Sequence, residues 1–208
     1  MLLGDEFWLL AHNEHTGKPR LSGRVSGLGL AAALIGELVY WQNVTVQGGF
    51  VHVIKLNPPP DALGHTMLDQ MVAEHSPYST RTWLAFFGRT ADEMVAQRLW
   101  RTGTLRQETS RKLLKQVVSY VPVDTNKAAW PMARIATTLR RESPMEHTDA
   151  FLAGLATATG LDQLMLGGAG AGPRQYLGHV MSGLAAPLYE LVIHTQSAVG
   201  DAVLSQRA

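Results

Sequence analysis

Apolar residues recur with a helical period along much of the chain, most clearly in residues 26–40, SGLGLAAALIGELVY. Leu30, Leu34 and Leu38 follow one another every four residues, with glycine and alanine at many of the positions between them. Side chains spaced in this way share one face of a helix, and small residues on another face let a neighbouring backbone come close. A helix that is apolar on nearly all sides lies at the centre of a bundle. The pattern therefore predicts a buried core helix about which other helices assemble.

Two other interpretations of the same stretch fail on its length and its surroundings. Between Gly27 and Trp41 the only charged residue is Glu37, but this run would extend about 22 Å as a helix, and the hydrocarbon core of a bilayer measures ~30 Å. Its glycines also match the turn of dinucleotide-binding proteins, which needs a buried strand ahead and an acidic residue about 20 positions further on. Turn-forming residues precede Gly27, and residues 42–55 contain no acid. We expect Glu37 to face solvent or a neighbouring arginine.

Two β-hairpins are predicted from alternating or β-branched segments. Apolar and polar residues alternate on both sides of Gly48-Gly49 in residues 44–54, which is typical of a hairpin with a tight glycine turn. Residues 104–120 contain a second stretch that is β-branched and aromatic. We therefore expect one hairpin directly after the core helix and another near the middle of the chain.

The helices that surround the core helix are predicted from their start signals and their periodicity. Asp61 is placed to cap one helix, Pro131 suits the first turn of another, and Ser143-Pro144-Met145-Glu146 forms a capping box with proline at the first helical position. A glycine-rich segment, residues 167–173, is expected to be a flexible loop. The predicted helices span residues 2–12, 62–75, 79–87, 90–102, 131–141, 143–159 and 174–206, the last interrupted near Pro187. The fold class is therefore mainly α: a single domain over residues 1–208, a helical bundle around a central hydrophobic helix, with two small β-hairpins.

Composition agrees with a compact domain and limits its partners. The 208 residues are 46% hydrophobic and 17% charged, which is enough apolar surface for a substantial core. The net charge of +1 gives no overall electrostatic case for nucleic acid, so we expect no nucleic-acid partner. The chain has no cysteine, and the first residues carry Asp5 and Glu6 where an export signal would carry lysine or arginine. These features favour a cytoplasmic protein.

No residue pattern predicts catalysis, a cofactor or a metal site. The chain contains neither a G-x-S-x-G elbow nor a G-K-[ST] phosphate loop. His12 and His15 have a spacing that could share a metal, but no third ligand is evident, and solvated loop histidines are favoured. We therefore expect a protein that is not an enzyme and that holds neither cofactor nor metal.

Basic residues are the one candidate for binding chemistry. Between positions 98 and 115 only Glu108 opposes six basic residues, and Arg20 and Arg24 flank the loop that leads into the core helix. Such a surface attracts anions such as lipid headgroups, nucleic acid or an acidic partner, and the alternative is an ordinary solvated face. The six residues are Arg98, Arg101, Arg106, Arg111, Lys112 and Lys115.

Several short segments, taken in order, match those of a known family over nearly the whole chain. They are residues 6–12 (EFWLLAH) with 16–19 (TGKP), 29–38 (GLAAALIGEL) followed by a hairpin, Trp83-Leu84, Arg98-Leu99 with 103–105 (GTL), and 149–155 (DAFLAGL) through Gly160-Leu161. In their order and spacing the chain resembles the Golgi phosphoprotein 3 family, particularly its bacterial members.

The resemblance implies a mainly helical fold without catalytic activity. It also implies binding to phosphatidylinositol 4-phosphate on Golgi membranes and recruitment of the cytoplasmic tails of glycosyltransferases. A projecting hairpin, here residues 104–120, would mediate self-association into a homo-oligomer. The hairpin residues expected to take part are Leu105, Leu113, Leu114, Val117 and Tyr120.

The resemblance also suggests where a lipid headgroup would bind. Family members surround the headgroup with a tryptophan and three arginines. The matching positions here hold Ser22 for the tryptophan, Ala31 and Asp92 for two of the arginines, and Arg89 for the third. The residues expected to bind the headgroup are therefore Arg20, Arg24 and Arg89. The expected partner is an anionic phospholipid or phosphoinositide surface to which the protein attaches peripherally, and the alternative is a soluble oligomeric scaffold that binds a protein.

Overall fold

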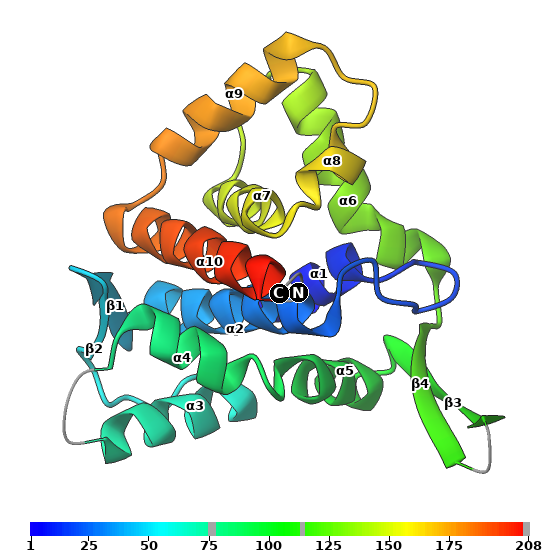
Figure 1. The fold of residues 1–208 in the computed structure, drawn as a ribbon, viewed down its shortest axis with the longest axis horizontal. Coiled ribbons are helices and arrows are strands. Elements are labelled where there is room, and N and C mark those ends of the chain that lie inside the picture. The colour runs from blue at the N-terminus through cyan, green and yellow to red at the C-terminus, as the bar shows by residue number, and fades with distance from the viewer. Residues whose placement is uncertain (75–77, 113–114, 206–208) are drawn as a thin grey trace.

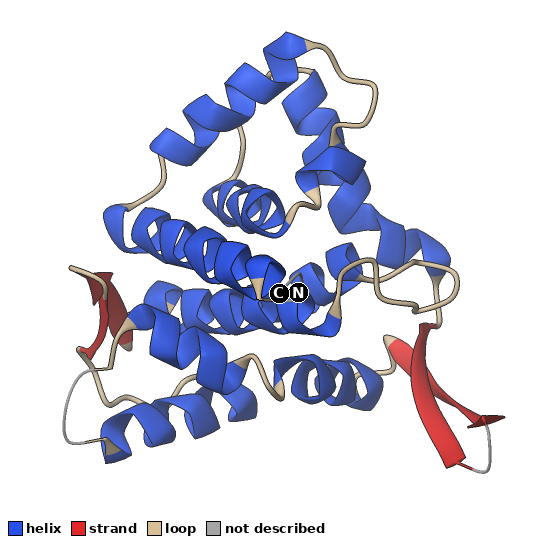
Figure 2. Cartoon of the chain, in the orientation of Figure 1, coloured by secondary structure: helices blue, strands red, loops and turns tan. Residues whose placement is uncertain are grey.

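Ten helices and two antiparallel hairpins make up the described part of the chain (Figures 1 and 2). The computed structural model describes the backbone of residues 1–74, 78–112 and 115–205, and the side chains of all of these except 110–112 and 115–117. This is the mainly α domain with two small hairpins that the sequence predicts. In chain order the elements are α1 (Leu3–Ala11), α2 (Gly23–Tyr40), β1 (Val44–Gln47), β2 (Phe50–Val53), α3 (Ala62–Ala73), α4 (Thr80–Phe87), α5 (Ala91–Arg101), β3 (Leu105–Lys112), β4 (Lys115–Pro122), α6 (Thr125–Arg140), α7 (His147–Thr159), α8 (Asp162–Met165), α9 (Ala171–Ser182) and α10 (Ala186–Leu204).

The predicted core helix is α2, and it lies between two groups of helices. Figure 1 shows α10 and α7 on one side of it and α4, α5 and α3 on the other, and α1 also packs against it. All residues of α2 from Val25 to Leu38 are buried. At 18 residues α2 begins earlier than the run that the sequence argument measured, so its length does not exclude a membrane span as predicted; 78% of it is, however, buried inside the protein. The apolar stretch is therefore a core helix, as its periodicity predicts.

The glycines of α2 serve close packing. Residues 20–22, directly ahead of α2, form a loop and not the strand that a dinucleotide fingerprint requires. A Cβ on Gly27 would lie 2.1 Å from the carbonyl oxygen of Gly88, at the end of α4. Real Cβ atoms do not approach so closely, so glycine is needed for α2 and the end of α4 to meet backbone to backbone.

The two hairpins lie at opposite edges of the molecule in Figure 2. In the first, β1 pairs with β2 from Val44 opposite Val53 to Gln47 opposite Phe50. Gly48 and Gly49 have φ of 60° and 84°, the positive values that a two-residue hairpin turn requires. In the second, β3 pairs with β4 in one continuous register, and the hairpin extends away from the helices.

Two predicted helix starts are wrong because other residues set them. Asp124 accepts hydrogen bonds from the backbone N–H groups of Asn126 and Lys127, so α6 begins at Thr125 and Pro131 lies inside the helix. Ser143 does not cap α7, because the following proline disfavours helical backbone there and residues 143–146 are not helical. The helix begins at His147 and ends, as predicted, at Thr159, and Gly160 follows it in the left-handed region.

The remaining boundaries depart from prediction by a few residues. α3 ends at Ala73, and the predicted end at residue 75 lies outside the described residues. α9 begins at Ala171, so part of the expected flexible loop is helical, and the short helix α8 was not predicted. The break near Pro187 is confirmed, because α9 ends at Ser182 and α10 begins at Ala186. Residue 206, the predicted end of the last helix, lies outside the described residues.

Candidate functional site

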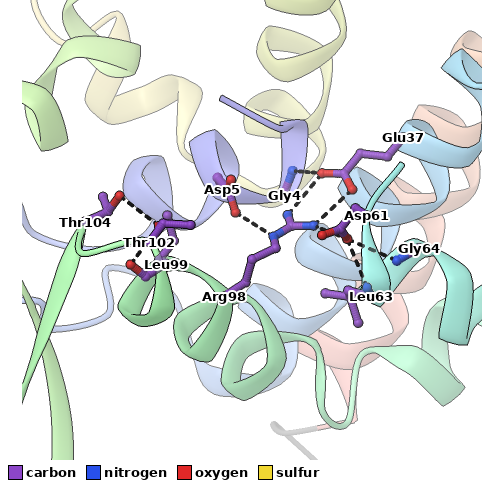
Figure 3. Close-up of polar contacts among 10 residues, drawn as sticks. All are labelled: Gly4, Asp5, Glu37, Asp61, Leu63, Gly64, Arg98, Leu99, Thr102 and Thr104. Atoms are coloured by element: carbon purple, nitrogen blue, oxygen red, sulfur yellow. Dashed lines mark hydrogen bonds and ion pairs between the residues drawn. The ribbon is translucent and has the colours of Figure 1, made fainter. Parts of the chain in front are cut away.

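Arg98 is not available to bind an anion, because three carboxylates already surround it (Figure 3). Its Nε lies 2.8 Å from Asp5 Oδ1, its Nη1 2.8 Å from Asp61 Oδ2 and its Nη2 3.1 Å from Glu37 Oε1. The Arg98 side chain is 11% exposed and that of Glu37 2%. We call these four residues the Arg98 cluster. The prediction that Arg98 contributes to an anion-attracting surface is therefore wrong.

Backbone donors complete the Arg98 cluster. The N–H of Gly4 donates to Glu37 Oε1 at 2.7 Å, and the N–H groups of Leu63 and Gly64 donate to Asp61 Oδ2 at 3.1 Å. These donors belong to the first turns of α1 and α3, where a helix favours negative charge. Of the two predicted alternatives for Glu37, the one in which it faces an arginine is confirmed. The one in which it faces solvent is wrong.

Within the Arg98 cluster, burial and the neighbouring charges shift each pKa in opposite directions. Burial raises the pKa of Asp5 and the pKa of Glu37, and the attraction of Arg98 offsets this only in part. For Arg98, burial lowers the pKa, but the nearby carboxylates of Glu37 and Asp5 outweigh it and raise the pKa overall. The arginine therefore stays charged, and its role is to hold α1, α2, α3 and α5 together.

Arg101 and Arg106, the other basic residues of the 98–115 stretch whose side chains the structure describes, do not converge on one site. Arg106 pairs with Glu108 on the same strand, and about half of each side chain is exposed. Arg101 lines a cavity of about 350 Å³ beside the Arg98 cluster. The side chains of Arg111, Lys112 and Lys115 lie outside the described residues.

Three arginines from two parts of the fold instead line a single cavity. Arg24 lies in the first turn of α2, Arg81 in the first turn of α4, and Arg89 just after α4 ends. The cavity measures about 630 Å³ and is open to solvent. We call it the arginine cavity. Its lining residues are Gly23, Arg24, Leu28, Arg81, Ala85, Gly88, Arg89, Ala198 and Asp201.

The sequence builds this cavity through helical spacing and the glycine contact. Arg81, Ala85 and Arg89 are spaced by four residues, so they follow one side of α4 and its continuation. The contact between Gly27 and Gly88 brings the start of α2 beside the end of α4. Arg24 lies one turn before Gly27, and Arg89 follows Gly88 directly. The same backbone contact therefore places both arginines on one concave surface.

Among the described residues that line the arginine cavity, positive charge is in excess. Arg81 forms an ion pair with Asp201 on α10, and Arg24 Nη1 donates a hydrogen bond to Ser205 Oγ at 2.8 Å. Among the lining residues, three guanidinium groups face one carboxylate. The arginines are exposed, so the uncompensated charge is accessible to an external anion.

Arg20 does not join the arginine cavity. Its guanidinium forms an ion pair with Glu14, and its Nε donates to the carbonyl oxygen of His12 at 3.0 Å. It lines a different cavity of about 340 Å³, between the loop after α1 and the helices α6 and α8. The structure thus brings together two of the three predicted headgroup residues, Arg24 and Arg89, and separates the third.

Comparison with models of known protein families gives a match over most of the chain. The model of the Golgi phosphoprotein 3 (GPP34) family matches residues 3–180. The chain belongs to this family. No curated protein matches it. In this Golgi phosphoprotein 3 family member the match ends within α9, so the whole of α10 lies beyond the matched residues.

The positions where this Golgi phosphoprotein 3 family member lacks the expected headgroup residues do not line the arginine cavity. Ser22 is exposed directly ahead of α2, and Ala31 is fully buried in the core. Asp92 accepts a hydrogen bond from Trp8 Nε1 at 2.8 Å and so links α5 to α1. Asp92 therefore has a structural partner inside the protein.

His12 and His15 do not form a pair in this Golgi phosphoprotein 3 domain. His12 is buried, stacks on Trp8 with ring centres 3.8 Å apart, and lies 3.6 Å from Asp92, so the expectation of a solvated loop histidine is wrong for this residue. Burial lowers the pKa of His12, although Asp92 opposes this. The side chain of His15 is 67% exposed. Within residues 1–74, 78–112 and 115–205 no group of three or more histidine or acidic side chains is placed to hold a metal ion.

The residues expected to mediate self-association lie at different depths of the second hairpin. Leu105 is buried in the core, so it anchors the hairpin to α5. Tyr120 is half-buried, and its hydroxyl donates to Glu93 Oε1 at 2.9 Å. Leu113 and Leu114 lie outside the described residues, and Val117 pairs with Ser110 in the sheet register. Val118, which is not among the expected residues, is 52% exposed.

Sequence reasoning missed two of the four charged residues that line the arginine cavity, Arg81 and Asp201. Arg81 could have been found, because it lies two helical turns before Arg89 on a predicted helical segment and such residues share a face. Asp201 gave no signal, because its relation to Arg81 exists only once α10 packs against α4.

Proposed function

We propose that the chain is a non-enzymatic peripheral membrane protein that binds anionic lipid headgroups in the arginine cavity. The observation that carries this proposal is the convergence of Arg24, Arg81 and Arg89 on one open cavity with a single carboxylate, Asp201. Guanidinium groups bind phosphate through paired, charge-assisted hydrogen bonds. Membership of the Golgi phosphoprotein 3 family supports a lipid ligand. The protein would then act at the cytoplasmic face of a membrane.

Headgroup recognition is proposed to depend mainly on charge. Of the four positions that family members use around phosphatidylinositol 4-phosphate, only Arg89 keeps its chemistry, and Arg24 and Arg81 supply charge from other positions. The apolar side chains Leu28, Ala85 and Ala198 form part of the wall. Apolar walls reduce the local dielectric and strengthen each contact between guanidinium and phosphate. An anionic phospholipid, phosphoinositides included, is therefore the proposed ligand class.

Vesicle sedimentation at low salt tests this function. The protein is expected to pellet with phosphatidylcholine vesicles that contain an acidic phospholipid and to stay in the supernatant with phosphatidylcholine alone. Each of Arg24→Gln and Arg89→Gln should weaken binding about five-fold, since one basic residue near an anionic surface is worth about 1 kcal/mol. Raising the salt concentration should weaken binding further.

Arg174→Gln is the matched control for these substitutions. Arg174 is exposed on α9, which does not line the arginine cavity, and the variant changes net charge by the same amount. It should bind as the wild type does. Equal recovery of wild-type protein in both supernatants would reject the proposal, and so would an equal loss in the Arg174 variant.

A second candidate function is a soluble oligomeric scaffold that binds a protein partner. The observation that favours it is the β3–β4 hairpin, which extends from the helices in Figure 1 and exposes Val118. A strand pair with free edges can pair with another copy. Deletion of residues 107–116 should then lower the mass measured by light scattering, while circular dichroism should remain that of a helical protein. An unchanged mass would count against this role.

A further inference from the structure

The last turns of α10 close one side of the arginine cavity with polar groups. Ala198 and Asp201 line the cavity, and Ser205 follows α10. These residues, at spacings of three and four, share one face of the helix. Asp201 pairs with Arg81, and Ser205 accepts a hydrogen bond from Arg24. The end of α10 therefore contacts two of the three arginines that the proposed ligand would use.

The helix that carries Asp201 is fixed from its other side. Val199 and Ala202 are buried in the core, and Thr195 is fully buried one turn earlier. The backbone at Asp201 is therefore held against the protein, and its side chain can turn away from Arg81 without unfolding the helix. The side chain of Asp201 is 64% exposed and that of Arg81 46%, so their contact lies at the mouth of the cavity.

We propose that Asp201 competes with the bound anion for Arg81, an inference that rests on the proposed function. Its carboxylate occupies Arg81 as a headgroup phosphate would, and Ser205 occupies part of Arg24 in the same way. An anion that binds Arg81 must compete with the Asp201 carboxylate, and one that uses Nη1 of Arg24 must also displace Ser205. The family match ends at residue 180, so this competitor belongs to α10, outside the part that the match covers.

The solvent exposure of the Arg81–Asp201 ion pair determines how strongly Asp201 can reduce anion affinity. A solvent-exposed ion pair contributes about 0.2–1 kcal/mol, and its loss is easily compensated by a stronger partner. Asp201 should therefore weaken anion binding without preventing it. Removing the carboxylate is expected to tighten binding by up to about five-fold, which is the same energy expressed as a ratio of dissociation constants. Removing the neutral Ser205 hydroxyl should have a smaller effect.

The test compares Asp201→Asn with the wild type in two binding assays. One uses phosphatidylcholine vesicles that contain phosphatidic acid, and the other uses inorganic phosphate in solution, measured by calorimetry. Tighter binding of Asp201→Asn to vesicles alone identifies a lipid headgroup as the competing ligand, and tighter binding in both assays identifies phosphate itself. Either result supports the proposal. Ser205→Ala should bind the same probe up to about two-fold more tightly.

Two further variants separate a local effect from a general one. Asp69→Asn removes an equally exposed carboxylate from α3, which does not line the arginine cavity, and it should bind as the wild type does. If Asp201 acts through Arg81, the gain should shrink or vanish when Asp201→Asn is combined with Arg81→Gln. Equal gains from Asp69→Asn and Asp201→Asn would overturn the proposal, because net charge alone would explain them.

The outcomes also separate this proposal from the proposed function. If the wild type binds and Asp201→Asn binds no more tightly, the competitor is excluded and lipid binding stands. Weaker binding by Asp201→Asn would likewise exclude it, because Asp201 would then orient Arg81 for the ligand. If neither protein binds vesicles or phosphate, the proposed function fails and this inference fails with it.

Discussion

The Arg98 cluster and the arginine cavity use the same side chain with opposite balances of charge. In the cluster one guanidinium faces the carboxylates of Asp5, Glu37 and Asp61, and the Arg98 side chain is almost fully buried. In the cavity three guanidinium groups face one carboxylate, and all of them are exposed. The first arrangement joins four helices, and the second leaves charge for an external partner. The number of carboxylates around an arginine, and its burial, decide which role it has.

The energies of the two regions differ because water screens only one of them. A buried ion pair has lost its hydration, so removing one partner leaves a charge in a poor environment and costs several kcal/mol. An exposed pair keeps most of its hydration and contributes little to folding. We therefore expect substitutions in the Arg98 cluster to change stability and substitutions in the arginine cavity to change binding.

Substitution of Arg98 gives the largest expected effect. Arg98→Met leaves three carboxylates without their cation, and the free energy of unfolding should fall by about 3–5 kcal/mol. The same change at an exposed cavity position, Arg89→Met, should alter it by no more than about 0.5 kcal/mol. Urea denaturation at neutral pH measures both. Similar losses in the two variants would show that the comparison between the regions is mistaken.

Gly27→Ala should have an intermediate effect, and on both properties. The added Cβ would meet the Gly88 carbonyl oxygen at 2.1 Å, so α2 and the end of α4 must separate. Overpacking of this kind costs about 1–3 kcal/mol. Because Arg24 and Arg89 flank this contact, vesicle binding should weaken as well.

Gly23→Ala is the matched control for Gly27→Ala. It lies in the same helix, and a Cβ there would meet no atom within 4 Å. Its stability should equal or exceed that of the wild type, since alanine favours a helix over glycine. If both variants unfold at the same urea concentration, the close backbone contact does not carry the effect.

The smallest expected effect is on the pH dependence of stability. Burial raises the pKa of Glu37 above its ordinary value of 4.5, so the folded protein holds this proton more tightly than the unfolded chain. The stability that protonation provides is complete below about pH 4.5 and is lost as the pH rises through the raised folded value. Glu37→Gln removes this term. Relative to the wild type, the variant should become more stable as the pH rises from about 4.5 to 7.5.

Urea denaturation at several pH values within this range measures the difference. Glu108→Gln serves as the control, because Glu108 is half exposed on β3 and pairs only with exposed Arg106 in the described residues. Its stability should change with pH in parallel with the wild type. A parallel profile for Glu37→Gln would show that the buried carboxyl does not titrate abnormally.

Local patterns in the sequence were enough to predict most of the fold. The four-residue spacing of leucines identifies α2 as the core helix, and Asp61 and Gly160 mark helix ends by capping chemistry that acts within a few residues. The predicted starts of α6 and α7 are wrong, because Asp124 caps α6 ahead of Pro131 and because Pro144 keeps Ser143 out of the helix. Each of these determinants lies within one or two turns of the residue that it controls.

The candidate site was predicted only in part, because it depends on contacts between distant segments. The lack of cancelling acids nearby in the sequence suggested that Arg98 was free, but its carboxylates come from α1, α2 and the residue before α3. Arg20 was grouped with Arg24 by sequence proximity, yet it faces Glu14 on another side. Spacing along one chain segment does not show which side chains meet after the helices pack.

The backbone contact between Gly27 and Gly88 has a consequence for how the family can diversify. Main-chain atoms set the distance between α2 and the end of α4, so this distance does not depend on which side chains line the cavity beside them. The arginines of the cavity can therefore be replaced during evolution without a change in how α2 and α4 pack. Relatives that keep both glycines but replace Arg24 or Arg81 are expected to retain the hollow and to select different ligands.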